Sequence, residues 1–130
     1  MAYITVASGL LLLNGTYDVI CALAIVFDCC APFSRLHIDM FVQPEVFQDV
    51  ALRNLLAHWI FLYGLIRLCC GAGLCCLELA ASTYLLEMHC LMSMGHKLIP
   101  WKANMVSATC AALVLLCVWA RKEAHPAPAG

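Results

Sequence analysis

Long apolar runs, separated only by short polar segments, constrain this chain more than any other feature of its sequence. Of its 130 residues, 65% are hydrophobic and only 12% are charged, and the mean hydropathy is +0.92. A water-soluble domain carries about a quarter charged residues, which help to cover its surface. So few charges could not cover a globule in water, whereas in a bilayer lipid surrounds the outer face. We therefore predict an integral membrane protein.

Four segments have the length and apolar character of a membrane helix, which needs about 20 residues to cross ~30 Å of hydrocarbon. They cover about residues 4–27, 46–70, 74–94 and 101–120. The last is the clearest span, because Trp101 and Trp119 lie at its two ends and cations follow it. The sequence predicts an all-α fold, a bundle of four transmembrane helices. This single domain would occupy residues 1–122, followed by a Pro/Ala-rich tail over residues 123–130.

Three polar segments separate the apolar runs. The first, about residues 29–48, reads as an interfacial loop or short surface helix, with Pro44 well placed at the first position of the next helix. The second, residues 71–73, is short and glycine-rich and predicts a tight turn between antiparallel helices. One long tilted helix with a separate short one is the alternative. The third, residues 96–102, is a polar turn with an interfacial Trp.

Charge and motif content exclude several classes of function. The formal net charge is −1 and the seven basic residues are scattered, so we expect no nucleic-acid binding. The chain lacks the GxSxG, HExxH, P-loop and CxxC motifs. Most of the ten cysteines lie inside apolar runs, where cysteine serves as a small packing residue. We predict no enzyme activity and no catalytic, cofactor-binding or metal-binding residues.

Polar side chains at membrane depth are costly, so each needs a partner or a role. A predicted intramembrane polar network contains six of them: Asn14, Asp18, His58, Arg67, Glu78 and Glu87. If the second and third helices form an antiparallel hairpin with its turn centred near residues 72–73, residues equally far from the turn lie at the same membrane depth. Arg67 would then be at the depth of Glu78, and His58 at the depth of Glu87. The alternative is that Arg67 and Glu78 lie near the interface and reach water.

Asp18 is the most demanding of these groups because it lies near the middle of the first predicted span. Asn14 precedes it by four residues and so shares its helix face. His58 and Arg53 are the expected partners from other helices. The favoured interpretation is a buried polar clamp between helices, and the alternative is a proton relay or binding site.

Small residues recur along the fourth predicted helix. Ala103, Ser107 and Ala111 follow a small-xxx-small spacing, which lets helix backbones approach closely. We predict that this face packs against another helix, in this chain or in a neighbour.

Part of the chain resembles a known family. Arg53, Trp59 and Arg67, then cysteine-rich sequence and a stretch from Tyr84 to His89, are similar to the small four-helix endoplasmic-reticulum scaffold proteins of sterol biosynthesis. The resemblance covers roughly residues 51–89 and departs from the family in a shorter turn and in the histidine spacing. It implies a four-helix membrane scaffold without catalysis of its own.

These observations favour a non-catalytic accessory or structural subunit of a large membrane complex. A mitochondrial inner-membrane respiratory or ATP-synthase assembly is the first expectation. Its partners would be other membrane subunits and lipids, with structural phospholipids in its grooves. One alternative is an endoplasmic-reticulum scaffold for sterol-biosynthesis enzymes. The other is a small proton-conducting or transport protein that uses Asp18, His58 and Glu87.

Overall fold

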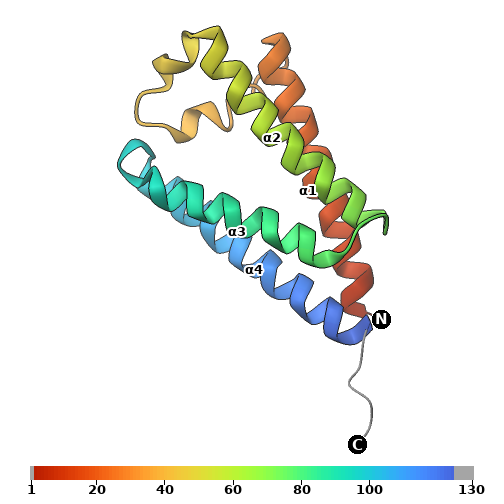
Figure 1. The fold of residues 1–130 in the computed structure, drawn as a ribbon. Helices are drawn as coiled ribbons and strands as arrows, with labels where there is room; N and C mark the ends of the chain where they lie inside the picture. Colours follow the sequence, from red (N-terminus) through yellow and green to blue (C-terminus); the bar gives the residue numbers. More distant parts are fainter. Residues whose placement is uncertain (1, 125–130) are drawn as a thin grey trace, which may run out of the picture.

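The computed structural model describes residues 2–124, most of which are helical. The four long helices, drawn in Figure 1, are α1 (Ala2–Phe27), α2 (Val50–Gly71), α3 (Leu77–Ser93) and α4 (Pro100–Ala124). Three 3-10 helices lie between them: η1 (Ile38–Met40), η2 (Pro44–Gln48) and η3 (Gly95–Lys97). The all-helical prediction is confirmed. Residues 123 and 124 extend α4, and residues 125–130 of the predicted tail lie outside the described part.

Three of the helices are long and apolar enough to cross a membrane. These candidate spans are Tyr3–Phe27, Val50–Gly71 and Pro100–Ala124. The fourth helix, α3, has 17 residues and carries Glu78 and Glu87. At 1.5 Å per residue its length is about 26 Å, slightly less than a ~30 Å hydrocarbon core.

The helices form two pairs, which diverge from one end of the molecule (Figure 1). α1 packs mainly on α2, and α3 mainly on α4, whereas α2 and α3 are in contact over much less of their length. The start of α1 lies beside the end of α4. There the Ile4 N–H donates to Glu123 Oε2 at 3.2 Å, and the Tyr3 and Trp119 rings meet edge to face at 5.6 Å.

Two helix starts differ from their predicted positions. α2 begins at Val50 because the Asp49 carboxylate caps it, accepting from the backbone N–H groups of Ala51 at 2.8 Å and Leu52 at 3.2 Å. Pro44 therefore begins η2 and not α2. α3 begins at Leu77 and not near residue 74.

The connection between α2 and α3 covers residues 72–76, which is longer than the predicted three-residue turn. Gly73 adopts a left-handed φ of 77° and donates its N–H to the Cys70 carbonyl at 3.1 Å. The Leu74 N–H donates to the Cys69 carbonyl at 2.8 Å. These two bonds form a Schellman motif, which satisfies the last carbonyls of α2.

The backbones of α1 and α2 touch where two glycines meet. A methyl group placed on Gly15 would lie 2.8 Å from the Gly64 carbonyl oxygen and 2.8 Å from the Leu68 backbone nitrogen. One placed on Gly64 would lie 3.0 Å from the Gly15 carbonyl oxygen and 3.0 Å from Asp18 Cβ. This close crossing brings the Asp18 side of α1 against α2.

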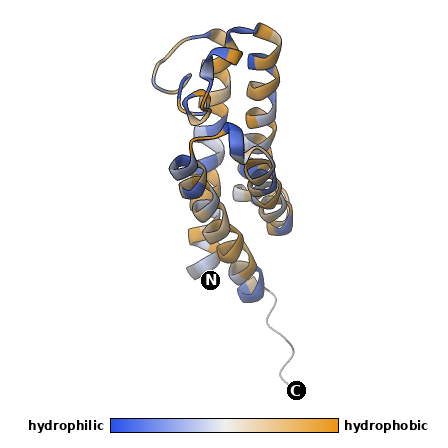
Figure 2. Cartoon of the chain, turned by 90° about the vertical axis from the view of Figure 1, so that its left-hand side faces the viewer, coloured by the Kyte–Doolittle hydropathy of each residue, from blue (hydrophilic) through white to orange (hydrophobic). Residues whose placement is uncertain are grey.

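The outer faces of the helices are apolar. Large hydrophobic side chains are exposed on all four, including Leu13, Leu55, Leu85 and Leu115. Figure 2 shows hydrophobic residues along the helices and hydrophilic ones gathered mainly at helix ends and in connecting segments. This surface suits a lipid environment, as the sequence predicted.

The segment between α1 and α2 joins the two helix pairs at their divergent end. Phe41 and Leu98 form an antiparallel bridge, in which the Val42 N–H donates to the Lys97 carbonyl at 2.9 Å and the Ile99 N–H to the Met40 carbonyl at 2.8 Å. Leu98 is only 2% exposed. The segment therefore bridges the two pairs at this end.

Candidate intramembrane polar site

Arg67 is the centre of a polar cluster that links three helices. Its side chain extends from α2 and the residue is only 2% exposed. Nη1 donates to Asp18 Oδ2 on α1 at 2.6 Å, and Nη2 donates to Glu87 Oε2 on α3 at 2.5 Å. Nε donates to Thr83 Oγ1 on α3 at 3.1 Å. All three guanidinium nitrogens thus have a partner, as a buried cation requires.

Aromatic rings also hold the guanidinium. Its carbon lies 3.9 Å from the centre of the Tyr84 ring and 5.3 Å from the centre of the Tyr63 ring. Both distances are within the range of cation–π attraction. The Tyr84 hydroxyl donates to Asn14 Oδ1 at 2.7 Å, which forms a second polar link between α3 and α1.

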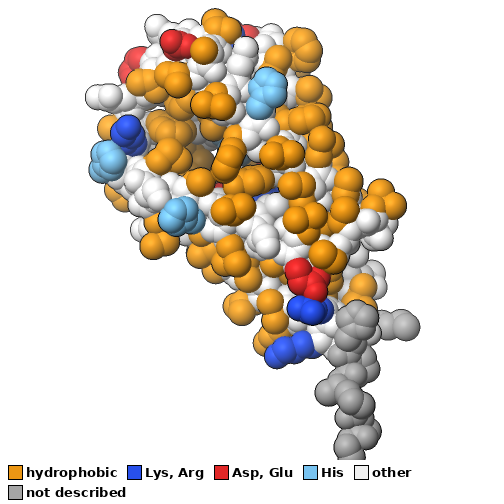
Figure 3. Space-filling model, in the orientation of Figure 1, with side chains coloured by type: hydrophobic (Ala, Val, Ile, Leu, Met, Phe, Trp, Pro, Cys, Tyr) orange, Lys and Arg blue, Asp and Glu red, His pale blue; other side chains and the backbone are white. Residues whose placement is uncertain are grey.

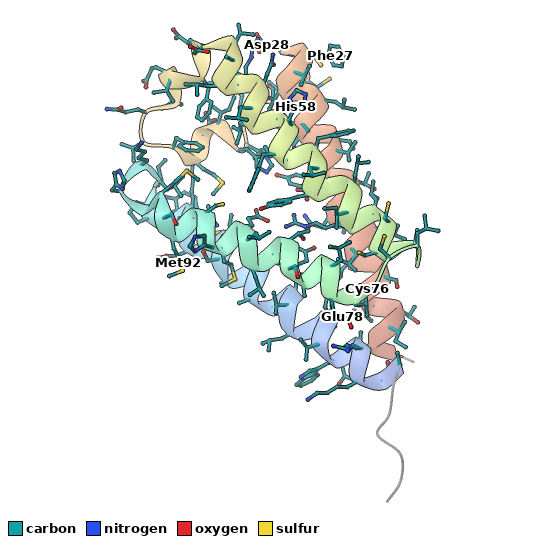
Figure 4. The ribbon with its side chains drawn as sticks, in the orientation of Figure 1. Phe27, Asp28, His58, Cys76, Glu78 and Met92 are labelled. Atoms are coloured by element: carbon teal, nitrogen blue, oxygen red, sulfur yellow. The ribbon has the colours of Figure 1, made fainter. Side chains whose placement is uncertain are left out.

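Four of the six residues of the predicted polar network lie in this cluster, namely Asn14, Asp18, Arg67 and Glu87. Glu78 does not. It lies near the start of α3 and pairs with Arg121 of α4, with 2.7 Å between Arg121 Nε and Glu78 Oε1 (Figure 4). The expected Arg67–Glu78 pair was wrong, because Arg67 reaches Glu87, about two and a half turns further along α3.

His58 also lies outside the cluster. It is exposed, and its Nδ1 is 2.6 Å from the Asn54 carbonyl of its own helix (Figure 4). The expected His58–Glu87 pair was wrong. Folding the sequence about the turn assumed two helices in contact along their length. α2 and α3 instead diverge from a longer connection, so residues at equal distances from it do not meet.

Asp18 has a different cation from those the sequence indicated. Its partner is Arg67, and neither His58 nor Arg53 reaches it. Arg53 pairs with Asp28 at 3.3 Å near the end of α1. The glycine crossing explains the difference, since it brings Asp18 close to the part of α2 that carries Arg67.

Sequence reasoning missed Thr83 and Tyr63 as members of the cluster, and noted Tyr84 only through the family resemblance. A local signal was present: Thr83, Tyr84 and Glu87 are spaced so that they share one face of α3. Tyr63 had a local signal too, because it precedes Arg67 by four residues on α2 and so shares its helix face.

The predicted packing residues of α4 are half-buried. Ala103, Ser107 and Ala111 all have intermediate exposure. The deepest residues of α4 are Cys110, Cys117 and Ala120. A close backbone contact between helices lies elsewhere, at glycines of α1 and α2.

Two cavities flank the cluster between the helix pairs. The smaller, about 80 Å³, is lined by Asp18, Arg67 and Glu87 together with side chains of α2, α3 and the connecting segment. The larger, about 490 Å³, lies between α1, the connecting segment and α4. Figure 3 shows the surface hollowed between the connecting segment and α3, with hydrophobic side chains around the hollow.

Two buried polar atoms at the smaller cavity have no hydrogen-bond partner among residues 2–124. They are Nδ1 of His37, from the connecting segment, and the hydroxyl of Tyr63, whose residue is 6% exposed. Burial lowers the pKa of His37 below its usual value, an effect that the nearby Glu87 carboxylate opposes. The imidazole is therefore neutral at pH 7.

The chemistry of the cluster is that of charge pairing and hydrogen bonding. Within the described part of the chain, no group of three or more His, Cys, Asp or Glu side chains is placed to hold a metal ion. All ten cysteines are free thiols.

Comparison with known proteins found no match: no protein-family model, curated protein or solved structure matches this chain. The site must therefore be interpreted from its own geometry.

Proposed function

We propose that this protein is a non-catalytic membrane scaffold or accessory subunit, with all four helices crossing the bilayer and other membrane proteins bound to its apolar faces. The observation that carries the proposal is that the central cation is bound by side chains of two neighbouring helices. Such a network defines one arrangement of α1, α2 and α3, while the outer faces carry exposed Leu, Val and Trp side chains.

Two cellular settings suit this role. The first is an accessory subunit of a mitochondrial inner-membrane respiratory or ATP-synthase assembly, with lipids in its grooves. That setting is supported by the hydrophobic composition of the sequence and by its lack of catalytic motifs. The second is an endoplasmic-reticulum scaffold for sterol-biosynthesis enzymes. One specific observation favours it: Arg67 and Tyr84, two residues that carry the family resemblance, are in direct contact at the centre of the fold.

Purification of the tagged protein in mild detergent, followed by native-gel migration and mass spectrometry of its neighbours, tests the role. We expect migration in a complex with other integral membrane proteins. Subcellular fractionation of the same cells separates the two settings. A protein that stays monomeric, with no stoichiometric membrane partner in either fraction, would contradict the scaffold proposal.

A matched pair of variants sharpens this experiment. Arg67→Met removes the central cation, whereas Arg121→Met removes the cation of the exposed pair with Glu78. If the cluster defines the shape that partners recognise, only Arg67→Met should lose the complex. Equal loss with both variants would show that partner binding does not depend on the cluster.

A further inference from the structure

The charges of the buried cluster do not balance. Asp18 and Glu87 supply two carboxylates, and Arg67 supplies one cation. With every group in its ordinary ionised form, the cluster has a net charge of −1 at membrane depth. An unbalanced charge in that environment costs several kcal/mol, by order of magnitude. Some positive charge must be supplied to this site.

Among residues 2–124, no cation other than Arg67 forms an ion pair with either carboxylate. Arg35 is paired with Asp39 at 3.5 Å, and Lys102 donates to the Asp39 carbonyl at 2.7 Å, both at the rim of the larger cavity. The remaining titratable side chains that line the two cavities are Tyr17, His37, Tyr63, Tyr84, Cys90 and Cys110, and none of them is a lysine or an arginine.

The smaller cavity has room for molecules of water size, and the charged cluster lies in its otherwise mainly apolar lining. Its volume of about 80 Å³ is enough for a few water molecules. His37 and Tyr63 line the cavity beside the two carboxylates, and each has a buried polar atom, Nδ1 and the hydroxyl, without a hydrogen-bond partner among residues 2–124. Glu87 is the more accessible carboxylate, with 24% of its side chain exposed against 6% for Asp18.

We propose that this cavity is a proton-binding site, in which Asp18 and Glu87 share one proton beside Arg67. The proton exchanges with the aqueous side through water held next to His37. In the binding step, a hydronium ion transfers its proton to a carboxylate oxygen; an O–H bond forms, one water molecule is released and the net charge of the cluster becomes zero. Release is the reverse step. The scaffold role does not require this site, so the proposal stands independently of it.

Infrared spectroscopy of the full chain in lipid bilayers at pH 7, with ¹³C-labelled Asp or Glu, tests the proposal. We expect the carbonyl stretch of a protonated carboxyl group, shifted by one of the labels and by D₂O. Both Asp18→Asn and Glu87→Gln should abolish this band, since the remaining carboxylate then balances Arg67 alone. Glu78→Gln is the control and should keep the band.

The outcomes are decisive even if a variant does not fold. The absence of a protonated carboxyl band in the wild-type protein overturns the proposal without any substitution. A band that persists in folded Asp18→Asn or Glu87→Gln protein overturns the shared proton, because one carboxylate would then be protonated by itself.

Proton exchange through water next to His37 is tested by a separate measurement. His37→Phe keeps a ring of similar size but removes the buried nitrogen. We expect the carboxyl band to exchange into D₂O about a hundredfold more slowly in this variant, the lower end of the effect of a positioned proton-transfer group. An unchanged exchange rate overturns the route. Partner capture, measured on the same samples, reports the scaffold role separately.

Discussion

Arg67 and Asp18 are separated by 49 positions in sequence, yet Arg67 Nη1 lies 2.6 Å from Asp18 Oδ2, and both side chains are buried. A buried pair of this kind is weak as a source of net stability, but it is costly to break because the remaining charge loses its partner.

Arg67→Met should therefore destabilise the protein strongly. It leaves Asp18 and Glu87 without their cation, and we expect a loss of about 3–5 kcal/mol in the free energy of unfolding. Arg121→Met breaks a more exposed pair and should cost about 0–1 kcal/mol. Unfolding in detergent or bicelles compares the two variants. Equal losses would contradict a central role for Arg67.

Gly15→Ala should separate α1 from α2. The added methyl would lie 2.8 Å from two backbone atoms, so the helices must move apart, at an expected cost of about 1–3 kcal/mol. Gly9→Ala is the matched control on the same helix. Within the described residues no atom lies within 4 Å of that methyl, and alanine is the better helix former. Thermal unfolding should show a lower midpoint for Gly15→Ala only.

Tyr84→Phe should remove the hydrogen bond to Asn14 while keeping the aromatic face against Arg67. Hydrogen bonds between membrane helices contribute about 0.6 kcal/mol on average and up to about 1.7 kcal/mol. We expect a loss in that range. Tyr84→Leu also removes the ring and should lose more. A double-mutant cycle with Asn14→Ala measures the coupling, and additive losses would mean that the bond contributes nothing.

His37 should make stability depend on pH. Burial lowers its folded pKa below the ordinary value of 6.5. As the pH falls through 6.5, the unfolded chain binds a proton on His37 before the folded protein does, so the free energy of unfolding decreases. Above pH 6.5 this contribution is constant. His37→Gln should make the thermal midpoint less dependent on pH between pH 7 and 5.

The natural cysteines can report whether α3 crosses the bilayer. Cys29 and Cys30 after α1, and Cys75 and Cys76 after α2, are exposed, while the other six are buried or half-buried. A membrane-impermeant maleimide should label these two pairs from opposite sides. Gly95→Cys, at the end of α3 where a side chain meets no obstruction, should be labelled from the side of Cys29. Labelling from the side of Cys75 would exclude α3 as a span.

The sequence alone determined the solvent and the class of fold. Hydropathy is a local property, so runs of about 20 apolar residues predict helices in lipid whatever their neighbours are. The positions of α1 and α4 follow closely from their runs, and the cost of polar groups in lipid pointed to Asn14, Asp18, Arg67 and Glu87. The starts of α2 and α3 were less accurate, because the Asp49 cap and the Gly73 turn decide them.

Only the tertiary structure decided which of these groups meet. Pairing depends on how each helix is rotated and where it crosses its neighbours, and these are set by contacts between residues far apart in sequence. The approach of Gly15 to Gly64 brings Asp18 towards Arg67, and the divergence of α3 from α2 moves Glu87 to Arg67 and leaves Glu78 with Arg121. Spacing along one helix contains no information about the backbone of another, which is the physical reason that the polar residues could be predicted and their partners could not.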